Sequence, residues 1–384
     1  MSEFQPVGFA FVGCGNIAGP YARQAREGHA DRVRIVGGFD TDAAKARAFA
    51  EQYGCKAYAS LDELLADEAA EAALNITTHT AHAEVTRALL TGGKHVHSEK
   101  PLATTREDAR ACLALAAEKG LLFACSPTVI LGEAQQTLKK VIADGVVGEP
   151  KEVYAEMNHG RIEAWHPDPA AFYGFGAGPL LDVGCYPLSV LTHVFGSVTA
   201  VRAMGGVRLP QRTIAIGPKA GQTFRVTNPD HTCVLLEFAG GLHGRLTASF
   251  FQVRSAQAGI EIHGTDGSLW LESAAPFNAR LRLCKPGQRE WTDLPYVPAG
   301  PGRGHPKRPR PRRPGDGRLS RARHLPVGPG RRRERPDRPR EVHVRLAGIG
   351  LPARGPTPKV PAIDSARPSS ARSVESVDEN ARSR

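Results

Sequence analysis

Apolar and polar positions alternate along residues 1–125 in a way that predicts strands separated by helices. Short apolar runs predict strands at Val7 to Val12, Val33 to Asp40, Ala72 to Ile76, Lys94 to Ser98 and Leu121 to Cys125. The segments between these runs carry apolar residues at helical spacing. Strands that alternate with helices form a parallel sheet with helices on both faces. We therefore predict an α/β fold that begins with a doubly wound Rossmann domain over residues 1–125.

Two helix starts in this domain show the residue pattern of a capping box. Ser60 is followed three residues later by Glu63, and Thr104 is followed by Glu107. In a capping box, the two side chains accept hydrogen bonds from amides of the first helical turn. Gly120 stands where the second of these helices should end, because glycine tolerates the left-handed conformation of a C-terminal cap.

From residue 126 the pattern changes to one helix followed by alternating strands. We predict a helix around Gly132 to Asp144, and strands at Glu152 to Met157, His231 to Phe238, Leu242 to Phe251, Ile260 to His263 and Ser268 to Leu271. Tight turns between neighbouring runs, one of them at Thr265-Asp266-Gly267, predict hairpins. Residues 126–300 are therefore predicted to form an α+β substrate-binding domain with a mostly antiparallel sheet.

Charge is concentrated at the end of the chain. Residues 301–384 hold 20 Arg and 2 Lys against 8 acidic residues, a net charge of +14, whereas the whole chain carries +11 and residues 1–300 carry −3. Arg, Pro and Gly dominate this segment, and it has too little apolar surface to offset the entropy of ordering. We predict that residues 301–384 form a disordered tail. Without interleaved aromatic residues or a recognition motif, the tail would bind nucleic acid only nonspecifically.

The cysteines and the N-terminus indicate a reduced cytoplasmic protein. The seven cysteines lie at wide spacings with no zinc-site pattern, so no metal site is predicted. Met1 to Gly19 has no basic segment ahead of its apolar stretch. No apolar run approaches the ~20 residues that a membrane-spanning helix needs. We therefore predict a protein that is neither secreted nor embedded in a membrane.

A glycine-rich turn follows the first predicted strand and opens the first helix. Gly13, Gly15 and Ala18 match the G-x-G-x-x-A pattern of dinucleotide-binding domains. The first glycine permits the tight turn, the second lets the backbone approach a pyrophosphate, and the small third residue allows close packing. The amides of Asn16 and Ile17 would then face the phosphates at the helix N-terminus. The alternative is a structural turn that binds no ligand.

Asp40, at the end of the second predicted strand, indicates the cofactor. A carboxylate 25 residues after Gly15 accepts hydrogen bonds from the ribose hydroxyls of NAD and repels the 2′-phosphate of NADP. NAD is therefore predicted over NADP. An Asp at this place also caps helices, and Asp42 is a second candidate for that role.

The chain resembles the glucose-fructose oxidoreductase, inositol dehydrogenase and rhizopine-catabolism family, Gfo/Idh/MocA, over roughly residues 5–300. The resemblance rests on four ordered motifs: Gly13-x-Gly15-x-x-Ala18, then Gly93-Lys94-His95-Val96 leading into Glu99-Lys100-Pro101, then Gly145-x-x-Gly148-Glu149-Pro150, and last Gly178-Pro179-Leu180-Leu181-Asp182-Val183-Gly184-Cys185-Tyr186-Pro187. It implies an oxidoreductase that transfers hydride between a nicotinamide and a sugar, cyclitol or related polyol, and we expect a homo-oligomer.

Two features depart from the family pattern. Inositol-dehydrogenase-like members have D-x-G-x-H where this chain ends the motif at Tyr186, as in the glucose-fructose oxidoreductase, aldose dehydrogenase and dihydrodiol dehydrogenase branches. Members usually end in an amphipathic helix, whereas this chain ends in the Arg- and Pro-rich tail, a composition that an altered reading frame would produce.

The resemblance and the chemistry together indicate three catalytic candidates: Lys100, Asp182 and Tyr186. Oxidation of an alcohol needs a proton acceptor while hydride leaves the same carbon. A phenol has a pKa near 10, but a neighbouring ammonium and the cationic nicotinamide would both favour the phenolate, so Lys100 would assist Tyr186. Asp182 lies four residues before Tyr186, on the same face if one helix spans both, and would orient Lys100 or a substrate hydroxyl. Three alternatives stay open: a packing role for the Tyr186 ring, a non-catalytic dinucleotide-sensing protein, and a chain inactivated by its tail.

Other candidates surround this centre. The family position implies that Glu99 serves the nicotinamide ribose or fixes Lys100, and that the Lys100-Pro101 bond is cis. Thr77, Thr78 and His82 follow a strand at the edge where doubly wound sheets bind ligands. His82 could equally fill a helix face. Trp165 and His166, in a Pro-flanked loop, are candidates for the substrate pocket.

Overall fold

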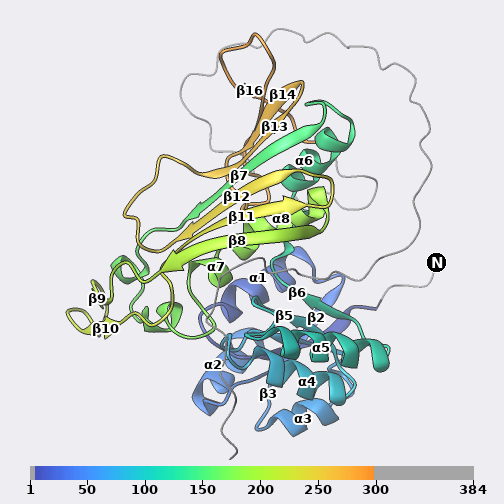
Figure 1. Ribbon diagram of the computed structural model, residues 1–384. Coiled ribbons are helices and arrows are strands. Elements are labelled where there is room, and N and C mark those ends of the chain that lie inside the picture. The colour runs from blue at the N-terminus through green and yellow to red at the C-terminus, as the bar shows by residue number, and fades with distance from the viewer. Residues whose placement is uncertain (1–4, 298–384) are drawn as a thin grey trace, which may run out of the picture. The chain divides into compact units, whose positions relative to one another are not determined.

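The structure, a computed structural model, describes residues 5–297. Its first half is a six-stranded parallel sheet with helices on both faces (Figure 1). The strands run in the order β3 (Lys56–Ala57), β2 (Val33–Phe39), β1 (Val7–Val12), β4 (Ala72–Asn75), β5 (His95–Ser98) and β6 (Phe123–Cys125). The five helices are α1 (Ala18–Gly28), α2 (Ala43–Tyr53), α3 (Leu61–Ala66), α4 (His82–Thr91) and α5 (Arg106–Glu118). This is the Rossmann strand order, and it confirms the predicted fold; β3, of two residues, was not predicted.

The helix ends confirm two of the three predicted caps. Ser60 Oγ accepts a hydrogen bond from the Glu63 amide at 3.1 Å, as predicted. Gly120 follows α5 with a φ of 65°. The prediction for Thr104 was wrong by one residue, because Thr105 caps α5 and its Oγ1 accepts from the Asp108 amide at 3.1 Å. Either threonine fits the sequence pattern, and only the backbone geometry chooses between them.

The second half is an eight-stranded sheet covered on one face by helices. Its order is β16 (Thr292–Asp293), β15 (Leu281–Cys284), β14 (Gly267–Leu271), β13 (Gly259–Gly264), β7 (Pro150–Asn158), β12 (His243–Ser249), β11 (His231–Phe238) and β8 (Val198–Gly206). The predicted hairpins β11–β12 and β13–β14 are both present, and only the β7–β12 pair is parallel. A separate small hairpin joins β9 (Gln211–Thr213) and β10 (Thr223–Arg225).

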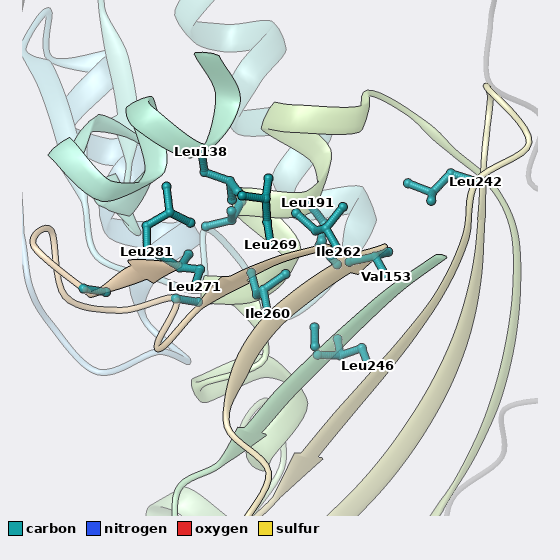
Figure 2. Close-up of a cluster of buried hydrophobic side chains, with 14 of the residues drawn as sticks. Leu138, Val153, Leu191, Leu242, Leu246, Ile260, Ile262, Leu269, Leu271 and Leu281 are labelled. Atoms are coloured by element: carbon teal, nitrogen blue, oxygen red, sulfur yellow. The ribbon is translucent and has the colours of Figure 1, made fainter. Parts of the chain in front are cut away.

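The helices of this half are α6 (Glu133–Ala143), α7 (Pro179–Asp182) and α8 (Cys185–Phe195), with 3-10 turns at η1 (Thr128–Leu131), η2 (Ile162–Ala164) and η3 (Ala170–Tyr173). Figure 2 shows how Leu138 of α6 and Leu191 of α8 meet side chains of the sheet such as Ile260 and Leu269. All four are fully buried. Alternate residues of each strand supply the sheet's share of this core, as the period-two pattern predicts.

The remaining predictions concern membrane-spanning helices, metal sites, cysteines and the C-terminal tail. No helix in the described part of the chain is long and apolar enough to cross a bilayer. Nor do its His, Cys, Asp and Glu side chains form a group of three that could hold a metal ion. All seven cysteines are free thiols. The predicted tail, residues 301–384, lies outside the described residues.

Candidate active site

The glycine-rich loop has the shape of a cradle for a pyrophosphate. Gly13 follows β1 with a φ of +96°, and a Cβ there would lie 2.7 Å from the Ile76 carbonyl oxygen, so glycine is required. A Cβ at Gly15 would meet nothing within 4 Å, so the space beside the loop is open. Ala18 is buried at the start of α1. An open backbone turn at a helix N-terminus fits the diphosphate of a dinucleotide.

Asp40 connects this loop to the end of β2. Its two carboxylate oxygens accept hydrogen bonds from the amides of Cys14 and Asp42, each at 2.8 Å. Asp42 is the residue that caps α2, since its Oδ1 accepts from the Ala44 amide at 3.0 Å. Capping therefore falls to Asp42, and Asp40 stays beside the glycine-rich loop.

Lys100, Asp182 and Tyr186 come together from distant parts of the chain. Lys100 follows β5, and its bond to Pro101 is cis, as predicted. The Lys100 Nζ donates hydrogen bonds to Asp182 Oδ1 at 2.6 Å and to the Asp182 carbonyl oxygen at 2.9 Å. The same Nζ lies 5.7 Å from the centre of the Tyr186 ring. Asp182 was predicted to orient either Lys100 or a substrate hydroxyl, and in the structure it binds Lys100.

The condition under which Asp182 and Tyr186 would share a helix face, one helix that spans both, is not met. α7 ends at Asp182, and α8 begins only at Cys185. The two side chains approach Lys100 from separate helices, because the chain breaks its helical path at residues 183 and 184. Four-residue spacing is therefore not what brings them together.

Burial and the Asp182 carboxylate act on the charge state of this centre in opposite directions at Lys100. Burial disfavours the Lys100 ammonium, but the Asp182 carboxylate outweighs it, so the pKa of Lys100 is raised above its ordinary value. For Tyr186, burial raises the pKa of the phenol and the opposing effect of Lys100 is smaller. Lys100 therefore acts in the expected direction, since it lowers the pKa of Tyr186, while burial opposes it. In this structure the phenol is protonated at neutral pH.

Tyr21 is a residue of this centre that the sequence did not indicate. Its hydroxyl, on α1, donates a hydrogen bond to Glu99 Oε1, while Glu99 Oε2 accepts from the Lys100 amide at 2.9 Å. Ser126 Oγ lies 3.4 Å from the Tyr21 hydroxyl and 3.2 Å from His97 Nε2. Burial and the bond to Glu99 raise the pKa of Tyr21. Tyr21 thus holds Glu99, which in turn holds the backbone of Lys100.

The loop after β4 carries Thr77 and Thr78 at the carboxyl edge of the sheet. Thr77 Oγ1 donates to the buried Asn75 Oδ1 at 2.7 Å, and Thr78 is exposed. His82 is 2% exposed, and its ring nitrogens lie 2.7 Å from the Pro101 carbonyl oxygen and 3.1 Å from that of Thr77. Since both nitrogens are occupied, the structure favours the packing role over direct cofactor contact. His82 ties the Thr77 loop to the Lys100 turn.

Trp165 and His166 are connected to Tyr186 through the ring of Phe172. The His166 ring packs edge-on against Trp165 and Phe172, with centroid distances of 5.7 and 5.0 Å, and Phe172 shares an apolar cluster with Tyr186. Trp165 is 49% exposed. About half of the Trp165 surface is therefore open to solvent.

A buried ion network fixes the segment that carries these rings. The fully buried Arg212 guanidinium bonds Glu163 and Asp230, each at 2.6 Å, and lies 4.5 Å from the centre of the Tyr173 ring. The Tyr173 hydroxyl donates to Glu163 at 2.5 Å. A buried Arg with two carboxylate partners anchors the small β9–β10 hairpin to the loop of η2 and η3.

A pocket of about 570 Å³ opens beside Lys100. We call it the α8 pocket. It is lined by residues 100–102, residues 125–127, and Ile130, Leu181, Cys185, Ser189, Thr192 and His193. Tyr186, Trp165 and His166 are not among the lining residues, so Lys100 borders both the pocket and the Tyr186 side.

Comparison with known proteins identifies the family. The family model described as "Oxidoreductase family, NAD-binding Rossmann fold" matches residues 7–126, and the model of the "GFO/IDH/MocA C-terminal domain" matches residues 135–270. The chain belongs to the Gfo/Idh/MocA family of oxidoreductases. The two matches cover the Rossmann sheet, the second sheet except β15, β16 and the last residue of β14, and every motif on which the resemblance rests.

Curated relatives in this Gfo/Idh/MocA group are enzymes that act on diols and sugars. The chain is 28% identical to trans-1,2-dihydrobenzene-1,2-diol dehydrogenase of Bos taurus, over 76% of this chain and 81% of the relative. It is 29% identical to 1,5-anhydro-D-fructose reductase of Ensifer adhaerens, over 64% of this chain and 72% of the relative. Both names describe oxidoreductases, and neither describes a regulatory protein.

Solved structures show the same fold with either cofactor. The WlbA dehydrogenase of Bordetella pertussis, in complex with NADH and UDP-GlcNAcA, has a TM-score of 0.63 and 22% identity, over 77% of this chain and 79% of that one. KijD10, a 3-ketoreductase of Actinomadura kijaniata in complex with TDP-benzene and NADP, has a TM-score of 0.59 and 21% identity, over 76% of this chain and 85% of that one.

Proposed function

We propose that this oxidoreductase is an NAD(H)-dependent dehydrogenase that acts on a hydroxyl of a sugar, a cyclitol or a related polyol. The observation that carries the proposal is the 2.6 Å pair between Lys100 and Asp182 at the end of β5, beside the Tyr186 ring. The names of the diol and sugar relatives support the substrate class. Location in the cytoplasm and assembly as a homo-oligomer belong to the same proposal.

The three catalytic candidates have distinct tasks in this proposal. A bound nicotinamide supplies the hydride chemistry. Lys100 donates two hydrogen bonds to Asp182. Because an ammonium has three N–H donors, the third N–H of Lys100 is left for the substrate oxygen. Tyr186 exchanges the proton of the reacting hydroxyl. Because its raised pKa keeps the phenol protonated at neutral pH, Tyr186 is ready to donate a proton in carbonyl reduction, and alcohol oxidation requires a higher pH.

The cofactor residues follow the edge of the Rossmann sheet. Gly13, Gly15 and the amides of Asn16 and Ile17 would hold the diphosphate. Thr77, Thr78, Glu99 and Lys100 would line the nicotinamide end. Trp165 and His166 would border the substrate.

Asp40 supports NAD as the cofactor. Each of its carboxylate oxygens accepts one amide hydrogen bond and has capacity for another, so a ribose hydroxyl can bind there. A 2′-phosphate would meet the negative charge of Asp40 beside the glycine-rich loop.

The direct test is reduction of NAD⁺ by purified protein over a panel of aldoses, inositols, diols and sugar acids, followed at the nicotinamide absorbance band. We expect turnover of at least one compound, and Lys100→Ala should abolish most of it. NAD(H) binding without turnover of any panel compound, in both directions and up to alkaline pH, would instead favour the dinucleotide-sensing alternative.

A further inference from the structure

The α8 pocket lies within reach of the reacting centre, because Lys100 borders both. Four residues of α8 face it at helical spacing: Cys185, Ser189, Thr192 and His193. Tyr186, one position after Cys185, is not part of this face. The volume of about 570 Å³ falls within the range of sites that hold small organic ligands.

The hydroxyl groups of this pocket already donate to the protein. Ser189 Oγ donates to the Cys185 carbonyl oxygen at 2.8 Å, and Thr192 Oγ1 donates to that of Leu188 at 2.8 Å. Ser126 Oγ lies within hydrogen-bond distance of His97 and Tyr21. Each hydroxyl has only one donor hydrogen, so Ser189 and Thr192 can accept a hydrogen bond from a ligand but have no hydrogen left to donate.

The remaining lining is uncharged except at Lys100. Burial raises the pKa of the Cys125 thiol to about 12 and that of Cys185 to about 11, so both are neutral and act as small apolar groups. Burial and the nearby Lys139 lower the pKa of His193, so its ring is neutral at pH 7. No carboxylate is among the described lining residues, and Leu102, Pro127, Ile130 and Leu181 present carbon surface.

We infer that the α8 pocket binds an apolar part of the substrate, so that the enzyme prefers a ring with adjacent hydroxyls and a hydrocarbon remainder over a fully hydroxylated ring. A polyol in this pocket would give up water that donates to its oxygens and would find few hydrogen-bond donors in return, whereas a hydrocarbon edge has no hydrogen bonds to lose on burial. This inference rests on the proposed function and specifies its substrate class.

The test compares two six-membered carbocycles that differ chiefly in their hydroxyls. With NAD⁺ as cofactor, kcat/KM for trans-1,2-cyclohexanediol should exceed that for myo-inositol by roughly tenfold or more. Ser189→Phe and Ile130→Trp each fill the pocket from a different element. Either should lower kcat/KM for the diol by roughly tenfold or more. Ala114→Phe, on the exposed face of α5, is the matched control and should leave the diol rate within about twofold.

Binding is measured in parallel, by calorimetric titration of each ring into the protein with NADH. A preference for inositol would overturn the inference, as would a diol preference that neither filling variant changes; the proposed function would stand in both cases. If the parent protein binds the diol, the filling variants do not, and no compound is turned over, then the pocket is supported as a binding site and the proposed dehydrogenase function is overturned. If the diol is neither bound nor turned over, the inference is overturned.

Discussion

Replacing Tyr186 with Phe separates proton transfer from packing. Within residues 5–297 the Tyr186 hydroxyl makes no hydrogen bond, while the ring packs against two apolar clusters. Tyr186→Phe keeps this packing and leaves no partner unsatisfied. We therefore expect the free energy of unfolding to change by less than about 0.5 kcal/mol.

The expected loss of activity is much larger. A positioned acid or base contributes about 100- to 10,000-fold, which corresponds to about 2.7 to 5.5 kcal/mol of transition-state free energy. Tyr186→Phe should lower kcat by at least roughly a hundredfold on the best substrate, with the Kd for NAD(H) within a few-fold of that of the parent protein. Steady-state kinetics, cofactor titration and thermal melts measure the three quantities.

Tyr173→Phe is the matched control, because its hydroxyl serves the fold. That hydroxyl donates to Glu163 at 2.5 Å and accepts from the Ile162 amide at 3.1 Å, and Tyr173 is 1% exposed. Its loss should destabilise the protein by about 1–3 kcal/mol. Retention of near-normal kcat in Tyr186→Phe would refute the proton-transfer role, and the proton acceptor would then be sought at His166.

Four further predictions follow from the same geometry. Asp40→Ser should narrow the gap between NADH and NADPH affinity in fluorescence titrations, and equal or tighter NADPH binding by the parent protein would contradict the cofactor proposal. Because the pKa of Tyr186 is raised above its ordinary value near 10, alcohol oxidation should accelerate from about pH 7 to 10, while carbonyl reduction stays nearly constant over this range and slows only at higher pH. An oxidation rate that is flat from about pH 7 to 10 would exclude Tyr186 as the titrating group. Tyr21→Phe should lower kcat roughly tenfold with little change in the substrate KM, because it loosens Glu99 and Lys100; Tyr53→Phe, whose hydroxyl makes only a 3.4 Å contact, is the control. Lys100→Ala should lower kcat at least roughly a hundredfold, and combined with Tyr186→Phe it should cost little more than either change alone, since residues that act as a unit are not additive.

The Rossmann half could be predicted because its signals are local. Each apolar run of β1, β2, β4, β5 and β6 stands in consecutive residues, and every predicted strand overlaps the observed one. The turn at Gly13 needs a backbone that only glycine adopts readily, so the residue type itself reports the geometry. β3 was missed because two residues carry no measurable periodicity.

The catalytic candidates were predictable as a set but not in their arrangement. Lys100, Asp182 and Tyr186 could be named from motifs, yet the break between α7 and α8 that determines how they meet was not visible in the sequence. Tyr21 and Glu99 are 78 residues apart, and no local pattern marks such a contact. The Arg212 network likewise joins residues that are distant in the sequence.

The sequence alone determined the family, the strand and helix pattern of the Rossmann half, and the residue types of the active site. These depend on periodicity and on short motifs, which are properties of neighbouring residues. Only the tertiary structure decided the charge state of Tyr186 and the apolar character of the α8 pocket. Both depend on burial and on which hydrogen bonds are already made, and these are set by segments that meet only when the chain folds.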